Sequence, residues 1–228
     1  MEHLKNYIEP KEYKMKGKLI TFEGIEGCGK TTQIKLLSDY LSKEGHDVSK
    51  YHEPGSTRVG AEIRRILLHP DHIELCPNSE LLLYYAARTQ LISEKLIPDL
   101  DAGKLVLCDR YDDSSMAYQH YGRGLDLKLL NLLKGTFVKV EPDLTILLDV
   151  PVDMGLERSY RVTDEFRRPD RIESEVHEFH ERVRHGYLEM AKAEPKRFKV
   201  IDGNLPEHAV FAAVYQHVFP LLNENKKK

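Results

Sequence analysis

The sequence predicts an α/β fold in which a five-stranded parallel sheet is flanked by helices. Short runs rich in β-forming residues alternate along the chain with longer segments of helical periodicity. Two of the short runs, 104–109 and 144–150, are almost continuously apolar, which is typical of strands that are buried on both faces. Strands that are separated by helices need right-handed crossover connections, and these favour parallel pairing.

Five short segments are predicted to be the strands: KLITFE (18–23), DVSKYH (47–52), KLVLCD (104–109), LTILLDV (144–150) and RFKVID (197–202). Four longer segments are predicted to be helices: 31–45, 79–103, 175–193 and 207–222. The first helix has Ile34, Leu37 and Leu41 at helical spacing and Gly45 as its stop signal. The second carries Pro98 near its end. The least regular stretch, 161–171, lies between two helical patterns.

Composition and charge limit the classes of protein that the chain can represent. Of its 228 residues, 41% are apolar and 31% are charged, which is sufficient for a buried core in a soluble protein. The net charge of −3 gives no general attraction to nucleic acid or to an anionic membrane. Three widely spaced cysteines without a zinc-binding pattern indicate reduced thiols, so we expect a cytoplasmic protein.

The domain organisation is expected to be simple. No shift in composition marks a second domain, and we find no internal repeat. We expect an N-terminal extension over 1–16, one domain over 17–222 and a polar tail over 223–228. No apolar run approaches the roughly 18 residues that a membrane span needs, and the charged N-terminal segment lacks the apolar core of a secretory signal.

The segment GIEGCGKTT, directly after the first predicted strand, has the spacing of a phosphate-binding loop, which we call the cradle. Its glycines let successive backbone N–H groups turn toward phosphate oxygens, and the helix that follows adds the positive end of its dipole. The lysine of the pattern reaches the β- and γ-phosphates, and the threonine hydroxyl can bind Mg²⁺. The residues expected to bind the nucleotide are Gly24, Ile25, Glu26, Gly27, Cys28, Gly29, Lys30, Thr31 and Thr32.

The cradle indicates a nucleoside triphosphate without selecting a class of protein. A chance glycine-rich turn is the alternative, but the strand before it and the helix after it favour the phosphate-binding interpretation. No N-K-x-D run follows, which weakens a GTPase. No basic groove interleaved with aromatic residues is evident, which weakens a nucleic-acid motor.

Four further segments occur in the order found in one family: EPGST (53–57), YYAARTQ (84–90), DRYDDSSMAYQ (109–119) and DRIE (170–173). Together with FEGIEGCGKTT they closely resemble thymidylate kinase over roughly residues 18–203, and DRYDDSSMAYQ is the most specific of them. The resemblance implies a three-layer P-loop kinase fold and Mg²⁺-dependent transfer of the γ-phosphate of ATP to dTMP, in dTTP synthesis. It also implies a homodimer that acts on small molecules. The net charge and the lack of a long apolar run lead us to expect no nucleic-acid or membrane partner.

Asp109 and Arg110 follow the buried segment KLVLCD, so they are expected at the carboxyl end of a strand, where ligands bind in open α/β sheets. The Asp109 carboxylate can lie near a Mg²⁺ ion held by Thr31, which makes these two residues the candidate metal ligands. Arg110 can meet a phosphate with its forked guanidinium. The alternative is a purely structural ion pair between Asp109 and Arg110.

Tyr84 and Arg88 are one helical turn apart and share a face of their predicted helix. A ring beside a guanidinium suits a pyrimidine, and the resemblance implies that thymine stacks on Tyr84 while its O4 meets Arg88. The family commonly has Phe at the position of Tyr84. Without the family, a core aromatic would be the more common interpretation of Tyr84.

Other acceptor-site residues are implied by the resemblance. Gln119 and Ser115 are expected to contact the base, and Tyr118 to lie against the deoxyribose, where it disfavours a 2′-hydroxyl. The serines could instead be turn residues or helix caps. The expected substrate-binding residues are Pro54, Arg64, Tyr84, Arg88, Arg110, Ser114, Ser115, Tyr118 and Gln119.

The turn around Pro54 contacts the substrate in relatives, and the peptide bond before a proline can be cis. Relatives usually carry an arginine just before the glutamate of this turn. Here that position is His52, which removes one fixed positive charge, because a histidine is mostly uncharged at neutral pH. Arg64 matches an arginine near the monophosphate and base, whereas Arg65 is expected to be a solvated helix residue.

Phosphoryl transfer also needs positive charge around the moving group. One subclass of the family carries an arginine directly after the acidic residue of the cradle, but here that position is Gly27. The other subclass supplies the arginine from a mobile lid, which corresponds to the segment 158–171. Its arginines are Arg158, Arg161, Arg167, Arg168 and Arg171. We favour Arg161 and then Arg167 as the catalytic arginine, and we expect Arg158 and Arg171 to be hinge or anchoring residues.

Glu26 places a negative charge inside the cradle. In relatives an acidic residue here faces the sugar of the monophosphate and the lid arginine, so we expect Glu26 to position them and not to act as a base. The expected catalytic residues are Lys30, Glu26, Asp109, Arg110, Arg161 and Arg167. Two other functions stay open: a P-loop nucleoside or nucleotide kinase with a different acceptor, and a regulator that binds nucleotide without turnover.

Overall fold

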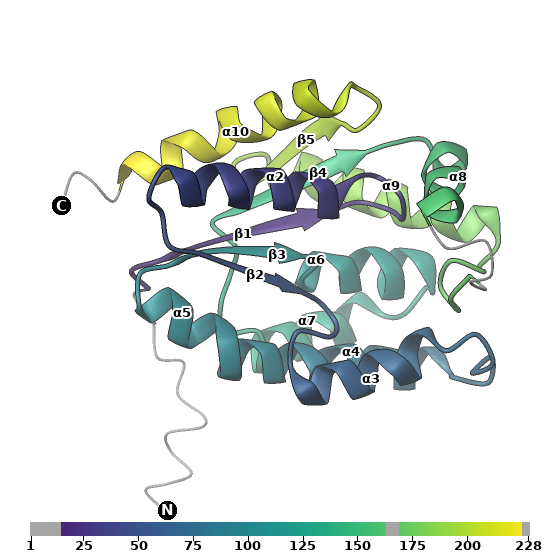
Figure 1. Cartoon of the computed structure of the whole chain (residues 1–228). Coiled ribbons are helices and arrows are strands. Elements are labelled where there is room, and N and C mark those ends of the chain that lie inside the picture. The colour runs from purple at the N-terminus through teal and green to yellow at the C-terminus, as the bar shows by residue number, and fades with distance from the viewer. Residues whose placement is uncertain (1–14, 163–168, 225–228) are drawn as a thin grey trace, which may run out of the picture.

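The computed structural model describes residues 15–162 and 169–224 and contains the five predicted strands (Figure 1). They are β1 (Lys18–Glu23), β2 (Val48–His52), β3 (Leu105–Asp109), β4 (Leu144–Asp149) and β5 (Phe198–Asp202). Each strand lies within one residue of its predicted bounds. All neighbouring strands pair in parallel, in the order β2-β3-β1-β4-β5. The predicted five-stranded parallel sheet is therefore confirmed.

Helical segments connect the strands. They are α2 (Lys30–Lys43), α3 (Arg58–Leu68), α4 (Pro77–Leu91), η1 (Ile92–Leu96), α5 (Ile97–Asp101), α6 (Asp112–Ser115), η2 (Met116–Gly122), α7 (Leu127–Phe137), α8 (Val152–Val162), α9 (His177–Ala193) and α10 (Glu207–Glu224). The segments η1 and η2 are π-helical. Gly45 follows α2 with a φ of 87°, so the predicted stop of this helix is confirmed.

Three expectations about helices need correction. The helix predicted over 79–103 begins at Pro77, whose missing N–H is harmless in a first helical turn, and it divides into α4, η1 and α5. We did not expect the helical segments at 112–122 or 127–137. The stretch expected to be least regular, 161–171, begins inside a helix, because α8 continues to Val162.

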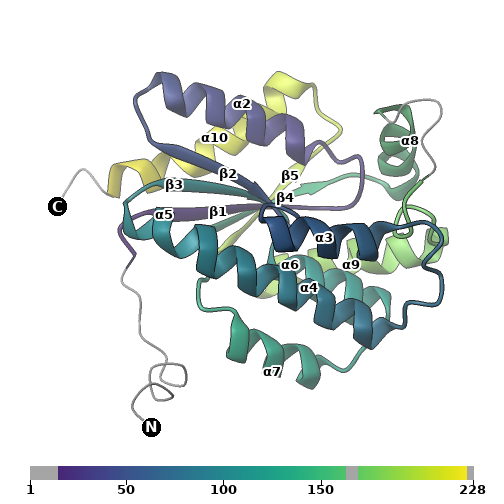
Figure 2. The ribbon, with the colours of Figure 1, turned by 60° about the horizontal axis from the view of Figure 1, so that its bottom comes forward.

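The elements form three layers, as Figures 1 and 2 show. Helices α2 and α10 cover one face of the sheet, whereas α4, α5, η2 and α9 cover the other. On that second side, α3 and α7 pack outside α4. The strands all point toward the side where α8 lies, so their carboxyl ends gather there (Figure 1).

The core has two parts because successive side chains of a strand point to opposite faces. Ile20 and Phe22 of β1 pack with Leu37 of α2 in a cluster that extends to α10 and α9. Leu19 of β1 and Val106 of β3 pack with residues of α4, α5 and α7. Both faces of the central strands are thus buried, which explains why their sequences are continuously apolar.

Several expected segments lie wholly or partly outside the described residues. These are most of the N-terminal extension, the middle of the expected lid (163–168, with Arg167 and Arg168) and the last four residues of the tail. Within the described ranges, no helix is both long enough and apolar enough to cross a membrane.

Candidate active site

The cradle connects β1 to α2 at the carboxyl edge of the sheet. Its glycines adopt positive φ angles of 134° at Gly24, 65° at Gly27 and 99° at Gly29, a region that residues with a Cβ rarely enter. Lys30, the first residue of α2, curls over the loop and donates from Nζ to Gly24 O at 3.0 Å and Ile25 O at 2.9 Å. The segment therefore has the curled backbone and the lysine that a phosphate-binding loop requires.

The absence of a side chain at Gly27 has a structural reason. A Cβ atom at this position would lie 1.9 Å from the carbonyl oxygen of Gly155 in α8, and one at Gly155 would lie 2.6 Å from the carbonyl oxygen of Glu26. The cradle and α8 therefore touch backbone to backbone. An arginine at position 27 cannot be accommodated beside this helix, which agrees with the expectation that catalytic charge comes from elsewhere.

Thr31 and Asp109, the candidate metal ligands, are adjacent. The Thr31 hydroxyl donates to Asp109 Oδ2 at 2.9 Å, and Asp109 is the last residue of β3. Both groups offer hard oxygen atoms, which suit Mg²⁺. Among the described residues, no group of three or more His, Cys, Asp or Glu side chains could hold a metal by itself. An ion here would complete its shell with water and substrate phosphates.

Arg110 has a left-handed backbone conformation with a φ of 67°, which costs a residue other than glycine conformational energy and often marks a functional position. Its guanidinium Nη2 donates to Glu26 Oε1 at 2.9 Å and Nη1 donates to Tyr187 OH at 3.2 Å. It also lies over the Tyr118 ring at 4.9 Å from the centroid. The guanidinium is thus held at the carboxyl edge of the sheet, as the sequence predicts.

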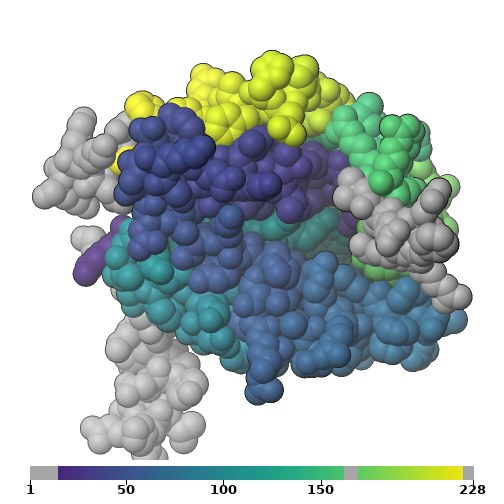
Figure 3. All heavy atoms as spheres, viewed as in Figure 1, coloured from purple at the N-terminus to yellow at the C-terminus, as the bar shows by residue number. Residues whose placement is uncertain are grey.

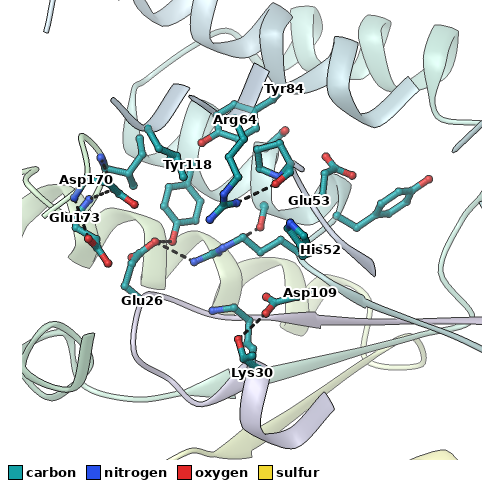
Figure 4. Close-up of a pocket in the computed structure, with 18 of the residues that line it drawn as sticks. Glu26, Lys30, His52, Glu53, Arg64, Tyr84, Asp109, Tyr118, Asp170 and Glu173 are labelled. Carbon is teal, nitrogen blue, oxygen red and sulfur yellow. Dashed lines mark hydrogen bonds and ion pairs between the residues drawn. The ribbon is translucent and has the colours of Figure 1, made fainter. Parts of the chain in front are cut away.

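Glu26 is enclosed by groups that favour its charge. Tyr118 OH donates to Oε1 at 2.5 Å (Figure 4). His180 Nδ1 lies 3.4 Å from Oε2. Burial alone would raise the pKa of Glu26, but Arg110, His180 and Lys30 together hold it well below its ordinary range. Glu26 is therefore ionised at neutral pH, which makes it a poor base and agrees with a positioning role.

A cavity of about 420 Å³ opens between the cradle, β2, α4 and η2. In Figure 4, Arg64, Tyr84 and Tyr118 lie at one side of this cavity, and Lys30 and Asp109 lie at the other. A second cavity of about 610 Å³ lies against the outer side of the cradle, α8 and the start of α10. We call them the smaller and the larger cavity. Gly27, Lys30 and Thr31 line both.

The smaller cavity is lined by all the expected substrate-binding residues, which are Pro54, Arg64, Tyr84, Arg88, Arg110, Ser114, Ser115, Tyr118 and Gln119. Ser115 Oγ is buried and makes no hydrogen bond to any described residue, which leaves it able to meet a ligand. Ser114 differs, because its hydroxyl donates to Glu23 Oε2 at 2.6 Å. Burial raises the pKa of Tyr84, so its hydroxyl stays neutral.

Arg88 forms more contacts within the protein than we expected. It is buried and forms ion pairs with Glu53 at 2.5 Å and Asp112 at 3.0 Å, and Nη2 donates to Tyr111 O at 3.1 Å. Its Nε is buried and finds no hydrogen-bond acceptor among the described residues. The role expected for Arg88 at a pyrimidine O4 thus stays a prediction. Its Nε is the nitrogen that could donate a hydrogen bond to the base.

The turn at Pro54 has the cis peptide bond that the sequence allows. Arg64 Nη1 donates to Pro54 O at 2.9 Å, which holds this guanidinium at the cavity wall. Burial and the charge of Arg64 lower the pKa of His52, so His52 is neutral near pH 7. Arg64 therefore supplies a positive charge beside the position where relatives usually have a second arginine. Arg65 is exposed and pairs with Glu62 on its own helix, as expected.

The described arginines of the expected lid have different partners. Arg158 Nη1 donates to Gly203 O at 2.9 Å, and Arg171 is buried, with Nε donating to Leu67 O at 2.8 Å. These contacts are typical of anchoring residues. Arg161 is exposed, forms a solvent-exposed ion pair with Glu157 on the same helix at 2.5 Å, and lines the larger cavity. Its catalytic role stays a prediction, and Arg167 lies outside the described residues.

Two residues behind the cavity were not anticipated from the sequence. Glu23, the last residue of β1, is fully buried and accepts hydrogen bonds from Tyr111 N at 2.7 Å and Tyr187 OH at 2.8 Å. Burial, reinforced by the Asp113 carboxylate, raises the pKa of Glu23 to about 7. The sequence signal that could have identified Glu23 is its position as a glutamate at the end of a largely apolar strand. Nothing in the local sequence marks Tyr187, because it faces the site only through the packing of α9.

Comparison with known proteins gives a consistent result. The sequence profile of a family described as thymidylate kinase matches residues 22–214, which is most of the chain. This chain belongs to the thymidylate kinase family. The thymidylate kinase of Pelotomaculum thermopropionicum is 49% identical over 197 residues, covering 86% of this chain and 90% of that protein. That of Syntrophotalea carbinolica is 50% identical over 188 residues, covering 81% and 87%.

A solved structure supports the same family. The crystal structure of thymidylate kinase from Ehrlichia chaffeensis superposes with a TM-score of 0.73 at 34% sequence identity and covers 89% of this chain and 98% of that one. The predicted three-layer P-loop kinase fold is therefore confirmed. The two cavities of this family member meet at Lys30, which lines both of them.

Proposed function

We propose that the protein is a dTMP kinase that transfers the γ-phosphate of ATP directly to dTMP and releases ADP and dTDP, in dTTP synthesis. The observation that carries this proposal is the meeting of the larger and the smaller cavity at Lys30 and Thr31. Ligands in the two cavities would bring their phosphates together at the cradle. Direct in-line transfer requires this arrangement of donor and acceptor.

ATP would occupy the larger cavity with its phosphates on the N–H groups of the cradle. Lys30 now donates to two carbonyl oxygens of the loop, and phosphate oxygens would replace these acceptors. Arg161 lies at the same cavity and is our first choice for the arginine that stabilises the transferred group, with Arg167 second. Closure of the segment 158–171 over both substrates would keep water from competing as acceptor.

Mg²⁺ would bind between Thr31 and Asp109, whose oxygen atoms fit its preference and already lie 2.9 Å apart. When bound, the ion would neutralise charge on the phosphates. The protein itself holds the Asp109 carboxylate at the end of a buried strand and the Thr31 hydroxyl in the first turn of α2. These two elements set the position of the ligands before any nucleotide arrives.

dTMP would occupy the smaller cavity with its phosphate toward Lys30 and Arg110 and its base toward Tyr84. Arg110 would clamp the phosphate while Glu26 and Tyr118 hold the guanidinium and the sugar in line. Tyr84 would stack on the base, and Arg88, Ser115 and Gln119 would contact its polar edge. This orientation is supported by the position of Lys30 beside Asp109 at one side of the cavity and of the Tyr84 and Tyr118 rings at the other (Figure 4).

The protein is further proposed to form a homodimer through helices. Four large apolar side chains between residues 58 and 82 are exposed: Val59, Ile66, Ile73 and Leu82. They belong to α3, α4 and the segment that connects them, which form the blue surface in Figure 3. Sedimentation that detects only monomers at micromolar concentration would refute the dimer.

We also propose a cytoplasmic location and a single domain over 17–222 with its lid at about 158–171. Cys28, Cys76 and Cys108 are free thiols, which suits a reducing compartment. All five strands belong to one sheet, which supports one domain.

The enzyme is tested by supplying purified protein with ATP, Mg²⁺ and one nucleoside monophosphate at a time, and following ADP. A strong preference for dTMP over dUMP, CMP and AMP is expected. Equal rates would instead favour a P-loop kinase of different specificity. A regulator without turnover would bind nucleotide in wild type, lose that binding in Lys30→Ala, and transfer no phosphate to any acceptor.

A further inference from the structure

Glu80 is a buried carboxylate just outside the smaller cavity. It lies in the first turn of α4, its side chain has no exposed surface, and it is not one of the residues that line the cavity. Its Oε2 accepts from Arg171 Nη2 at 2.6 Å and from Arg123 Nη2 at 3.1 Å. Its Oε1 accepts from Gln119 Nε2 at 2.8 Å and, over a longer distance of 3.3 Å, from Arg123 Nε. Glu80 therefore contacts Gln119, which lines the smaller cavity, but does not line the cavity itself.

The two arginines keep Glu80 ionised and in one orientation. Burial alone would raise the pKa of Glu80, but pairing with Arg123 and Arg171 lowers it below its ordinary value. Arg123 is itself held by Glu175 at 2.5 Å, and Arg171 by the carbonyl of Leu67. A carboxylate in this setting is an acceptor only and has no room to turn away.

This constraint decides which way the Gln119 side-chain amide points. An amide has a donor NH₂ on one side and an acceptor oxygen on the other, and exchange of the two is ordinarily cheap. An ionised carboxylate accepts only from the NH₂ side. Because Gln119 is 1% exposed and lines the smaller cavity, its other side, the oxygen, is the group that remains for a ligand.

An acceptor oxygen at the base site distinguishes the two kinds of pyrimidine edge. Thymine and uracil carry a proton on N3 and can donate to it. Cytosine has an unprotonated N3, so the two acceptors would face each other and both would lose their hydrogen bonds on binding. Buried polar groups that are left without hydrogen bonds cost free energy, so a site of this kind discriminates strongly against cytosine.

We propose that Glu80 is a specificity-determining positioning residue, which fixes the Gln119 amide with its oxygen toward the base and so selects pyrimidines that carry a proton on N3. This inference rests on the proposed function, namely that the smaller cavity takes a pyrimidine nucleoside monophosphate. It assigns Glu80 no contact with the substrate. Its effect passes wholly through the orientation of Gln119.

The test is Glu80→Gln. The oxygen of the new amide is expected at the position of Oε2, where Arg171 Nη2 and Arg123 Nη2 both donate. Its NH₂ then faces Gln119, at the cost of the longer contact with Arg123 Nε, and the Gln119 amide turns over. We compare kcat/KM for dTMP and 5-methyl-dCMP, which share the methyl group and differ only at N3 and C4. The preference for dTMP is expected to fall at least about tenfold, as one buried hydrogen bond gained or lost requires. The preference for dTMP over dUMP should stay within about twofold of wild type.

Glu175→Gln is the matched control, because Glu175 also pairs with Arg123 but has no hydrogen bond to Gln119 among the described residues. It should leave both preferences unchanged. An unchanged dTMP preference in folded Glu80→Gln would overturn the inference, as would an equal loss in Glu175→Gln. A wild-type enzyme that does not prefer dTMP over 5-methyl-dCMP would instead contradict the proposed function itself.

A second measurement does not depend on the variant folding. Neutron diffraction from deuterium-exchanged crystals of the wild-type protein with dTMP locates the deuterium atoms of the Gln119 amide. Deuterium on the side facing Glu80, and the bare oxygen facing N3, is the expected result. Deuterium facing the base would overturn the inference.

Discussion

The carboxylate of Glu26 holds the guanidinium of Arg110, with Oε1 2.9 Å from Nη2. A negative charge inside a phosphate-binding loop would repel a nucleotide if it faced the phosphates alone. Here the carboxylate forms an ion pair with Arg110 and accepts a hydrogen bond from the Tyr118 hydroxyl, and both residues line the smaller cavity. Glu26 lines the smaller cavity, so we expect changes at this residue to affect the acceptor more than ATP.

Glu26→Gln tests this assignment. The amide keeps the size of the side chain but weakens its hold on Arg110, so kcat/KM for dTMP should fall about 100-fold, as expected when a charge-assisted contact that aligns a substrate is lost. The KM for ATP should stay within about twofold of wild type. Steady-state kinetics with each substrate varied in turn measures both. Glu189→Gln, an exposed change on α9, is the control. A large increase in the KM for ATP would contradict the assignment.

The arginines of the lid should separate into two kinds. Arg161→Ala is predicted to lower kcat about 10³-fold, at the lower end for an arginine that acts on a transferred phosphoryl group. Its exposed pair with Glu157 contributes little, so the free energy of unfolding should change by less than about 0.5 kcal/mol. Rapid-quench kinetics and urea unfolding give the two quantities.

Arg158→Ala should behave in the opposite way, because its guanidinium is bound to the carbonyl of Gly203. Loss of this hydrogen bond is predicted to cost about 1 kcal/mol of stability with a much smaller effect on kcat. Arg65→Ala, at an exposed position on α3, serves as the control for both. If Arg161→Ala keeps more than about a tenth of wild-type kcat, the catalytic arginine is not Arg161 and Arg167 becomes the candidate.

Asp109→Asn should raise the requirement for Mg²⁺. The amide oxygen can still accept from Thr31 but attracts a divalent cation less than the carboxylate does, so half-maximal activity is predicted at about tenfold more Mg²⁺. Titration of activity with Mg²⁺ at saturating ATP and dTMP gives this value. Asp153→Asn, at an exposed position on α8, should not change it. An unchanged Mg²⁺ requirement in Asp109→Asn would exclude Asp109 as a ligand.

Glu23 should make stability depend on pH. Its pKa is about 7 in the folded protein against an ordinary 4.5, so the folded state holds a proton that the unfolded chain releases between these values. The stability that this proton contributes is present below pH 4.5 and is lost as pH rises through 7. The difference in unfolding free energy, wild type minus Glu23→Gln, should fall by on the order of 3 kcal/mol over this range.

Denaturant unfolding of both proteins at several pH values between about 4.5 and 8 gives this difference directly. Taking the difference removes the contributions of other titrating groups, because both proteins share them. A difference that is constant with pH, or that rises with pH, would show that Glu23 is ionised in the folded protein throughout.

Much of the fold could be predicted because its signals are local. The strands are short apolar runs between turns, and the cradle is a glycine pattern between a strand and a helix, so both were located to within a residue. The residues lining the smaller cavity came from ordered motifs at the carboxyl ends of strands and on one helix face. Periodicity and the parallel sheet place Asp109 and Arg110 at a strand end and Tyr84 and Arg88 on one helix face, whereas the other acceptor-site residues were expected only from the resemblance to thymidylate kinase.

The rest depends on contacts between distant segments. Glu23 meets Tyr187, and Glu80 meets both Gln119 and Arg171, across separations in sequence that no local pattern encodes. The ion pairs of Arg88 were missed for the same reason. These polar residue types are common on protein surfaces, so the sequence alone does not mark them. They are unusual here because the packing of α4, η2 and α9 buries them.

The most direct test of the account is a competition in one reaction. Purified protein receives ATP labelled at the γ-phosphate together with equal concentrations of dTMP, dUMP, CMP and AMP, and the labelled diphosphates are separated. The account predicts that the label appears in dTDP at least about tenfold above any other product, because even the missing methyl group of dUMP costs that much in a fitted pocket. Label shared equally among the diphosphates, or ADP formed without labelled dTDP, would contradict it.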